Sequence, residues 1–365
     1  MPITVAPNIE KLVPYVPGRS VEEVQRELGI SKLVKLASNE NPYGPSPRAQ
    51  EAIIQEVGKL NIYPDASSHN LKLVMSEFLD VDTDCIAFGN GSDDLIHLLG
   101  VTFLEEGDEI LQGDPSFIRY ESAALLNNVT CRMVPLLPDW SYDMDGLIAA
   151  VNDHTRLVFL ANPNNPTGAL VSHSEVERLL DSLPERALLV LDEAYYEYAS
   201  EHAECPRALE WVRQGRNVVV LRTFSKAYGL AGLRIGYGVM RAEIAGWLER
   251  TREPFNVNLL AQAGGAAAVA DTEFLKSILS YNRLGLQLLY TACDELGLSY
   301  TTSYANFLWI DTAKDASEVT AQLLRKGFIV RSSKAFKSST HIRVTVGTLA
   351  ETRDFIEALK SVLSQ

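Results

Sequence analysis

The chain has 365 residues, of which 46% are apolar and 22% charged, and this composition excludes a disordered, collagen-like or disulfide-held protein. Its 47 Asp and Glu residues outnumber its 33 Lys and Arg residues, which leaves a net charge of −14. A negative charge of this size repels nucleic acid and anionic lipid, so we expect neither nucleic acid nor a membrane as a partner.

The chain begins with an arm and continues into a long alternation of strands and helices. Several prolines followed by an amphipathic stretch at 21–28 predict an extended arm and a short helix, and a loop rich in Pro, Asn and Gly follows at 38–47. From there to about residue 255, short apolar runs alternate with helical patterns. The clearest predicted strands are 85–88, 109–111, 157–160, 188–191, 218–221 and 235–239.

Helix start signals lie between several of these strands. Ser172 and Glu175 form a capping-box pattern that predicts a helix to about residue 183. Ser92 and Asp93 precede the apolar run 95–99, which is another sign of a helix N-terminus. Strands that are apolar throughout and are separated by helices favour a mostly parallel sheet covered on both faces.

After Pro254 the pattern changes to that of a smaller α+β module. We therefore expect the main domain boundary near residue 255, with a long helix as the connector. The predicted elements are a helix over 259–296, a strand at 306–310, a helix at 317–326, strands at 328–330 and 342–346, and a helix at 351–363.

Metal, redox and export signals are missing from the sequence. The six histidines are scattered singly, so we expect no metal site. Cys85, Cys131, Cys205 and Cys293 have no CxxC spacing and are typical of buried thiols in a reducing compartment. The N-terminus has no signal-peptide pattern, and the uncharged run 256–270 is too short and too polar to span a bilayer. We expect a cytoplasmic protein.

Polar residues follow four of the predicted strands at the point where each ends. These segments are 89–93, 161–168, 192–195 and 222–226. Each alone has a structural explanation as a turn, a helix cap or a surface lysine. Because open parallel sheets bind ligands outside the carboxyl ends of their strands, the four segments together favour a functional site.

Three segments together resemble a known enzyme family. Residues 162–168, 192–195 and 225–237 look like the fold-type I pyridoxal-phosphate aminotransferases, and 35–45 and 342–348 resemble the histidinol-phosphate aminotransferases among them. The similarity extends over nearly the whole chain. It implies an α/β fold with a large domain, built on a mostly parallel seven-stranded sheet between helices, and a smaller α+β domain. The implied division is an N-terminal arm that is part of the small domain (1–36), a cofactor domain (37–255), and a connecting helix with the small domain (256–365).

The resemblance implies that pyridoxal phosphate is bound and that particular residues hold its ring. Lys226 would form the Schiff base and carry a proton during catalysis. Asp192 would pair with the pyridine nitrogen, and the family role of Tyr195 and Asn162 is to hydrogen-bond the phenolic oxygen. Phe117 matches the aromatic residue that stacks on the ring, where the family often has Tyr.

The resemblance also implies a phosphate cup and a shared site. A tyrosine from the other subunit completes this cup in the family, and Tyr63 matches it, which implies a homodimer with shared active sites. The remaining residues implied to hold the phosphate are Gly91, Ser92, Asp93, Thr223, Ser225 and Arg234.

Substrate recognition is implied for four further residues. Arg343 matches the arginine that meets the α-carboxylate of amino-acid substrates, and Arg331 matches the one associated with the phosphate of histidinol phosphate. Tyr15 matches a further phosphate contact, and Asn39 lies in the N-terminal segment that resembles the subfamily. The implied reaction is ping-pong transfer between L-histidinol phosphate with 2-oxoglutarate and imidazole-acetol phosphate with L-glutamate, which is a step of histidine biosynthesis.

Three alternatives stay open at this point. The first is an aminotransferase with an aromatic amino acid as its substrate. Close relatives of that kind share every cofactor residue, and pocket shape alone can change specificity, so the cofactor residues do not distinguish the two substrates. A decarboxylase similar to the threonine-phosphate decarboxylases is the second. The third, a cofactor-sensing regulator, is disfavoured because it carries a DNA-binding domain ahead of the catalytic module, whereas family-like sequence here begins near Tyr15 and the charge is −14.

Overall fold

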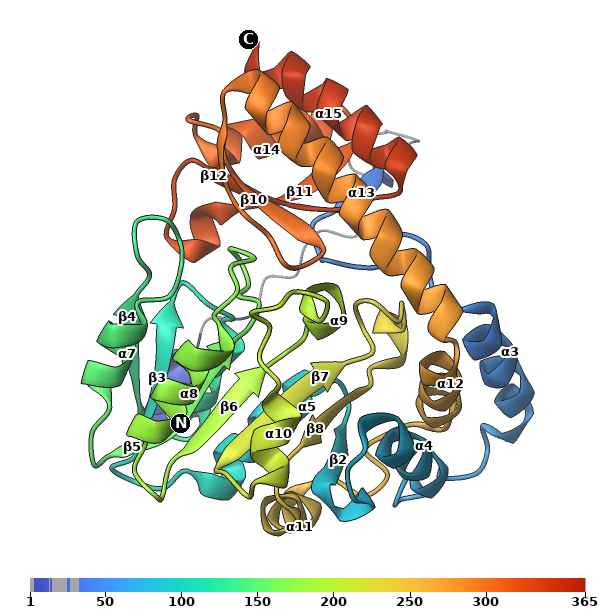
Figure 1. Cartoon of the computed structure of the whole chain (residues 1–365), viewed down its shortest axis with the longest axis vertical. Helices are drawn as coiled ribbons and strands as arrows, with labels where there is room; N and C mark the ends of the chain where they lie inside the picture. Colours follow the sequence, from blue (N-terminus) through green and yellow to red (C-terminus); the bar gives the residue numbers. More distant parts are fainter. Residues whose placement is uncertain (1–2, 13, 15–24, 27–32, 365) are drawn as a thin grey trace.

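A computed structural model describes residues 3–12, 14, 25–26 and 33–364 of the chain. Within these residues, seven strands form a central sheet in the order β2-β8-β7-β6-β5-β3-β4 (Figure 1). Strand β8 is antiparallel to its neighbours β2 and β7, and the other pairs are parallel, which confirms the predicted sheet. The strands are β2 (Ile86–Gly89), β3 (Glu109–Asp114), β4 (Thr130–Pro135), β5 (Thr155–Ala161), β6 (Leu188–Asp192), β7 (Val218–Thr223) and β8 (Gly236–Val239).

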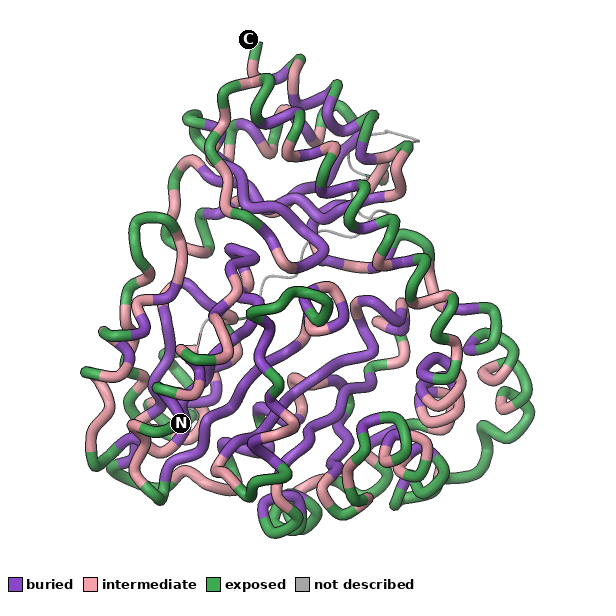
Figure 2. The backbone as a smooth tube through the Cα atoms, in the orientation of Figure 1, coloured by how far each residue is buried: buried purple, intermediate pink, exposed green. Residues whose placement is uncertain are grey.

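Helices cover this sheet on both faces. Along β5, Val158 and Leu160 belong to one buried apolar cluster, while Leu157 and Phe159 belong to another. Because side chains alternate between the faces of a strand, the two clusters lie on opposite faces. Figure 2 shows these strands as the most continuously buried part of the chain. The helices are α3 (Pro47–Glu56), α4 (His69–Leu79), α5 (Ser92–Phe103), α6 (Arg119–Leu126), α7 (Met144–Ala150), α8 (His173–Ser182), α9 (Tyr196–Ala199), α10 (Ala208–Arg213) and α11 (Ala242–Thr251).

Edge strand β4 was not among the clearest predicted strands. Its exposed and partly buried residues alternate, so it has no continuous apolar run. A strand at the edge of a sheet is less covered than its neighbours, which explains why the apolar-run criterion missed it.

A second sheet lies in the smaller, upper part of the molecule in Figure 1. Its strand order is β1-β11-β12-β10-β9, and β1, from the N-terminal region, is parallel to β11. The elements of this part are β1 (Val34–Leu36), β9 (Ser299–Thr301), β10 (Phe307–Asp311), β11 (Phe328–Ser332), β12 (His341–Thr345), α14 (Ala316–Arg325) and α15 (Leu349–Leu363), while α1 (Pro7–Glu10) lies against α6 of the larger part.

The predicted continuous helix over 259–296 is wrong, because two helices occupy this range. They are α12 (Leu259–Ala270) and α13 (Thr272–Leu296), and the Asp271 side chain between them caps α13 by accepting from the backbone N–H of Phe274. Ala261 of α12 packs in the core of the larger part, whereas Leu289 of α13 packs in the core of the smaller part. The chain therefore passes between the cores along α13, and the division at 36 and 255 stays a prediction.

Two further observations concern the rest of the chain. The short helix expected at 21–28 lies mostly outside the described residues. Among the helices that the structure does describe, none has both the length and the apolar character needed to cross a bilayer.

Candidate active site

Lys226 follows the carboxyl end of β7. Its Nζ donates a hydrogen bond to the backbone carbonyl of Ser38 at 3.0 Å. Burial is the largest cause that lowers the pKa of the Lys226 amine to about 8, and the charge of Arg343 acts in the same direction. A fraction of this amine is therefore neutral, and nucleophilic, near neutral pH.

Asp192 is the buried last residue of β6. The hydroxyl of Tyr120 donates to its Oδ2 at 2.6 Å, and the backbone N–H of Ala194 donates to Oδ1 at 3.2 Å. Burial raises the pKa of Asp192 to about 6, although both hydrogen bonds and the charge of Lys226 act to lower it. The carboxylate is therefore mostly ionised at neutral pH. Sequence reasoning missed Tyr120, which lies 72 residues away on α6.

Asn39 connects Tyr195 to the small sheet. The Nδ2 of Asn39 donates to the Tyr195 hydroxyl at 2.8 Å. The backbone N–H of Asn39 donates to Thr345 Oγ1 at 2.9 Å, and Asn306 Nδ2 donates to the Asn39 carbonyl at 3.0 Å. Asn39, predicted to bind substrate, is thus buried against Tyr195 and holds the segment after β1 at the site.

Two asparagines of the 162–168 motif face different partners. The Asn162 side chain donates to the Val171 carbonyl at 2.9 Å and accepts from the Val171 N–H at 2.8 Å. Asn165, which sequence reasoning did not single out, accepts a hydrogen bond from Nη1 of Arg343, whose Nη2 donates to the Ala37 carbonyl at 2.7 Å. The role predicted for Asn162 stays a prediction, while Asn165 lies beside the predicted substrate arginine.

Gly91 and Ser92 begin α5 next to Arg234. Gly91 has a φ of +84°, and a Cβ there would lie 2.5 Å from Nη2 of Arg234. A Cβ at Gly236 would lie 2.3 Å from the backbone nitrogen of Ser92. Nη1 of Arg234 donates to Ser225 Oγ at 3.5 Å. Free N–H groups at a helix N-terminus together with a guanidinium group favour an anion at this point.

Two other predicted cup residues have side chains engaged by neighbours. Asp93 Oδ1 accepts from Nε of Arg119 at 2.7 Å. Thr223 Oγ1 accepts from the backbone N–H of Ser225 at 3.1 Å and donates to the carbonyl of Ile235 at 3.4 Å. Thr223 thereby shapes the turn that leads into Lys226.

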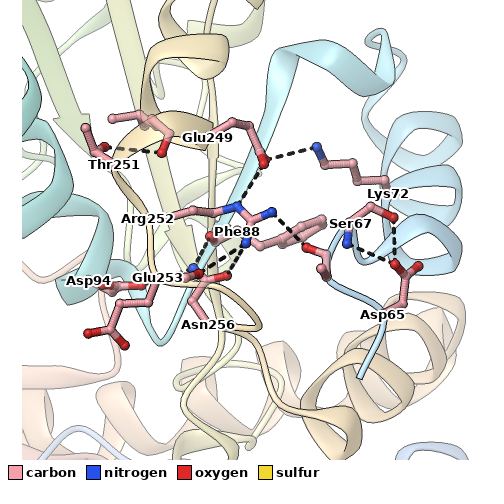
Figure 3. A network of polar contacts seen from close by, with 12 residues as sticks. Asp65, Ser67, Lys72, Phe88, Asp94, Glu249, Thr251, Arg252, Glu253 and Asn256 are labelled. Carbon is pink, nitrogen blue, oxygen red and sulfur yellow. Dashed lines mark hydrogen bonds and ion pairs between the residues drawn. The ribbon is translucent and has the colours of Figure 1, made fainter. Parts of the chain in front are cut away.

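A polar network behind the cup holds the end of β2 in place (Figure 3). Nδ2 of Asn256 donates to the carbonyl of Phe88 at 3.0 Å and to Asp94 Oδ2 at 3.3 Å. Nη2 of Arg252 donates to the Ala66 carbonyl at 2.9 Å. The network ties the start of α5 to the loop that follows Tyr63.

Three predicted aromatic residues differ in their surroundings. The half-buried Phe117 ring meets Tyr120 edge-on, with ring centroids 5.7 Å apart. Tyr63 is 78% exposed and stacks on Phe255 at 4.7 Å. Tyr15 lies outside the described residues.

Arg331 and Arg343 stand opposite each other on β11 and β12. Directly opposite residues of an antiparallel pair share one face, and like charges in such positions repel. Arg343 is buried, and Arg331 is partly buried. The pair therefore concentrates positive charge on one face of the small sheet. The charge of Arg343 also lowers the pKa of Lys226.

Residues 31–359 match the family described as aminotransferase class I and II. The chain belongs to this family. The aminotransferase is 44% identical to histidinol-phosphate aminotransferase of Moorella thermoacetica, over 100% of this chain and 95% of the relative. It is 45% identical to histidinol-phosphate aminotransferase 2 of Carboxydothermus hydrogenoformans, over 97% and 98% of the two chains.

A solved structure has the same fold. The crystal structure of histidinol-phosphate aminotransferase from Sinorhizobium meliloti in complex with pyridoxal-5'-phosphate superimposes with a TM-score of 0.89 and 30% identity. The match covers 99% of this aminotransferase and 97% of that chain. The family and fold inferred from the sequence are therefore confirmed.

Most predicted site residues of the aminotransferase gather where the strands of the large sheet end. Asp192 ends β6 and Lys226 follows the neighbouring strand β7, and the start of α5 lies beside the segment that follows Lys226. Asn39 and Arg343 come from the small sheet side, so both parts of the molecule contribute.

Proposed function

We propose that this aminotransferase interconverts histidinol phosphate and 2-oxoglutarate with imidazole-acetol phosphate and glutamate. The observation that carries the proposal is the pair Arg331 and Arg343, opposite each other on the small sheet with Arg343 near Lys226. A substrate phosphate carries up to two negative charges. Two guanidinium groups therefore complement a phosphate better than they complement the single charge of a carboxylate. The names of the curated relatives support the same reaction.

The residues of the site fit pyridoxal phosphate as the cofactor. The cradle between Gly91, Ser92 and Arg234 has no room for a Cβ and offers N–H donors and positive charge to a phosphate. The buried Asp192 offers a carboxylate to a protonated ring nitrogen. When bound, pyridoxal phosphate supplies an electron sink that stabilises negative charge on the substrate carbon that loses its proton.

Each residue then has a definite task in holding this group. Arg234, Ser225 and the N–H groups at the start of α5 bind the phosphate, and Asp192 orients the ring through its nitrogen. Tyr195 donates to the phenolic oxygen, because its own hydroxyl oxygen already accepts from Asn39. Phe117 covers one face of the ring. We propose that Asn165, rather than Asn162, reaches toward this oxygen, since Asn165 lies beside Arg343 and Asn162 holds the backbone of Val171.

Lys226 moves the proton. Its pKa of about 8 makes the Nζ a base that can accept the proton from the substrate carbon and return it one step later. The amine is charged below this pKa and neutral above it, so the reactive fraction rises with pH through about 8. Arg343 holds the carboxylate of glutamate so that the bond to be broken faces Nζ.

The substrate assay separates this reaction from its alternatives. Purified protein mixed with histidinol phosphate and 2-oxoglutarate is expected to form glutamate, measured by a coupled dehydrogenase. We expect kcat/KM for histidinol phosphate to exceed that for phenylalanine by about 100-fold, because an aromatic amino acid leaves Arg331 without a charged substrate partner. Equal values would favour the aromatic enzyme, and carbon dioxide release without an oxo acid would favour the decarboxylase.

We propose that two copies of the chain share their sites, with Tyr63 of one copy completing the phosphate cup of the other. Tyr63, Ile62, Leu60 and Ile54 are between 60% and 78% exposed, and such neighbouring apolar side chains are typical of an interface. Sedimentation should give twice the mass of the chain. Mixed dimers of Lys226→Ala and Tyr63→Ala chains should regain turnover, since one of their two sites is intact; no recovery would contradict the shared site.

We propose a cytoplasmic location for the enzyme. Cys85, Cys131, Cys205 and Cys293 are free thiols in the structure, and burial raises the pKa of Cys131, Cys205 and Cys293 to about 12. Such thiols fit the reducing compartment predicted from the sequence.

A further inference from the structure

Tyr120 joins two residues of the proposed cofactor site. Its side chain is fully buried, and its hydroxyl donates to Oδ2 of Asp192 at 2.6 Å. Its ring stacks on Phe159, with centroids 4.5 Å apart and planes 10° apart, and the Phe117 ring meets it at 83°. These contacts fix the ring, so the direction of its hydroxyl group toward Asp192 is also fixed.

Tyr120 is a donor at every working pH. Burial, and then the charge of Asp192, raises the pKa of the Tyr120 hydroxyl well above its usual value. The hydrogen bond it donates lowers the pKa of Asp192 and partly offsets the burial that raises it. Tyr120 thus favours the ionised form of a carboxylate that its surroundings would otherwise neutralise.

Other charged or titratable groups face this pair from several elements. Asp93 on α5 raises the pKa of Asp192, and Lys226 after β7 lowers it. Tyr142 and Tyr195 face the Tyr120 hydroxyl and act to raise its pKa. Among these groups, Tyr120 has the hydrogen bond that makes the largest lowering contribution at Asp192.

We propose that Tyr120 is a positioning residue that holds the Asp192 carboxylate ionised and aimed at the ring nitrogen of the cofactor. The inference rests on the proposed cofactor site and adds to it a residue that does not touch the cofactor nitrogen itself. The Tyr120 ring also packs against Phe117. Tyr120 therefore aligns both Asp192, which would meet the ring nitrogen, and Phe117, which would cover the face of the cofactor ring.

Tyr120→Phe tests the inference, because it removes the hydroxyl and keeps the ring. The probe is pyridoxamine phosphate, the amine form of the cofactor, which cannot bond to Lys226; its dissociation constant for the apoenzyme is measured by calorimetry across pH. In the wild type, affinity should fall as pH drops through about 6, where Asp192 takes up a proton. In Tyr120→Phe we expect the acid limb to move up by about one pH unit, so that the dissociation constant rises about twofold at pH 7 and about tenfold at pH 5.

Tyr142→Phe is the matched control. Tyr142 is also buried, but its hydroxyl donates to the amide oxygen of Asn164 at 2.9 Å. Thermal unfolding measures how much stability each variant loses with its buried hydroxyl. The pH at which affinity for pyridoxamine phosphate falls should change in Tyr120→Phe alone. An equal movement in Tyr142→Phe would overturn the inference.

A double variant separates a direct effect from a structural one. With Asp192→Asn in place, adding Tyr120→Phe should change the dissociation constant at pH 5 by less than about twofold, because the coupling requires the carboxylate. A further tenfold loss would show that Tyr120 acts elsewhere and would overturn the inference. Failure of the wild-type apoenzyme to bind pyridoxamine phosphate would instead overturn the proposed cofactor site, so the two failures are distinguishable.

Discussion

Lys226→Ala is expected to lose turnover by roughly 10⁴-fold while keeping the fold, because it removes the base that moves the proton. The lysine side chain is only partly buried, and its Nζ makes one hydrogen bond, to Ser38, so little stability is lost. The measurement is glutamate formation from histidinol phosphate and 2-oxoglutarate. The variant should also lose the visible absorbance band that a covalently attached cofactor gives to the wild type.

Two companion variants make this prediction sharper. Lys226→Arg keeps the positive charge but has a pKa too high to supply a neutral amine, so it should be as inactive as Lys226→Ala. Lys276→Ala removes an exposed lysine of α13 that pairs with Glu273, and it should keep full turnover. Turnover in Lys226→Arg close to that of the wild type would show that charge rather than proton transfer is the role of Lys226.

The second large effect is expected at the paired arginines. Arg343→Ala should lower kcat/KM for glutamate by about 100-fold or more, because a charge-assisted, two-pronged contact to the carboxylate is lost. Arg331→Ala should lower kcat/KM for histidinol phosphate by about 100-fold and change that for glutamate by less than about threefold. Steady-state kinetics with each substrate varied in turn measures the difference.

The structure gives a reason to expect this selectivity. Arg331 faces Arg343 across an antiparallel strand pair, so the two positive charges lie on one face of the sheet and complement a substrate anion. Arg325→Ala, an exposed residue at the end of α14, is the control and should not alter either substrate. An equal loss for both substrates in Arg331→Ala would contradict its role as the phosphate contact.

The central sheet could be predicted from the sequence because its strands are buried on both faces. Strands such as β5 and β6 are apolar at nearly every position, and the polar residues that follow them mark the end at which ligands bind. The capping box at Ser172 and Glu175 was equally local, and it is present at the start of α8. These signals depend on neighbouring residues and need no knowledge of the fold.

The break in the helical region 259–296 depends on a weaker signal. The range is rich in Ala and Leu, and propensity alone predicts one helix. Asp271 is an N-cap residue in the middle of this range, and the packing of α12 and α13 in different cores decides that its side chain caps a new helix.

The sequence by itself determined the family, the strand ends that carry Asp192 and Lys226, and most strands of the central sheet, because motifs and burial patterns are local. Only the tertiary structure decided that Tyr120 donates to Asp192, that Asn39 holds Tyr195, and that Asn165 faces Arg343. The physical reason is the distance along the chain: Tyr120 and Asp192 are 72 positions apart, and Asn39 and Tyr195 are 156 positions apart. Hydrogen bonds between such residues depend on how helices and sheets pack, and the sequence around either partner does not predict them.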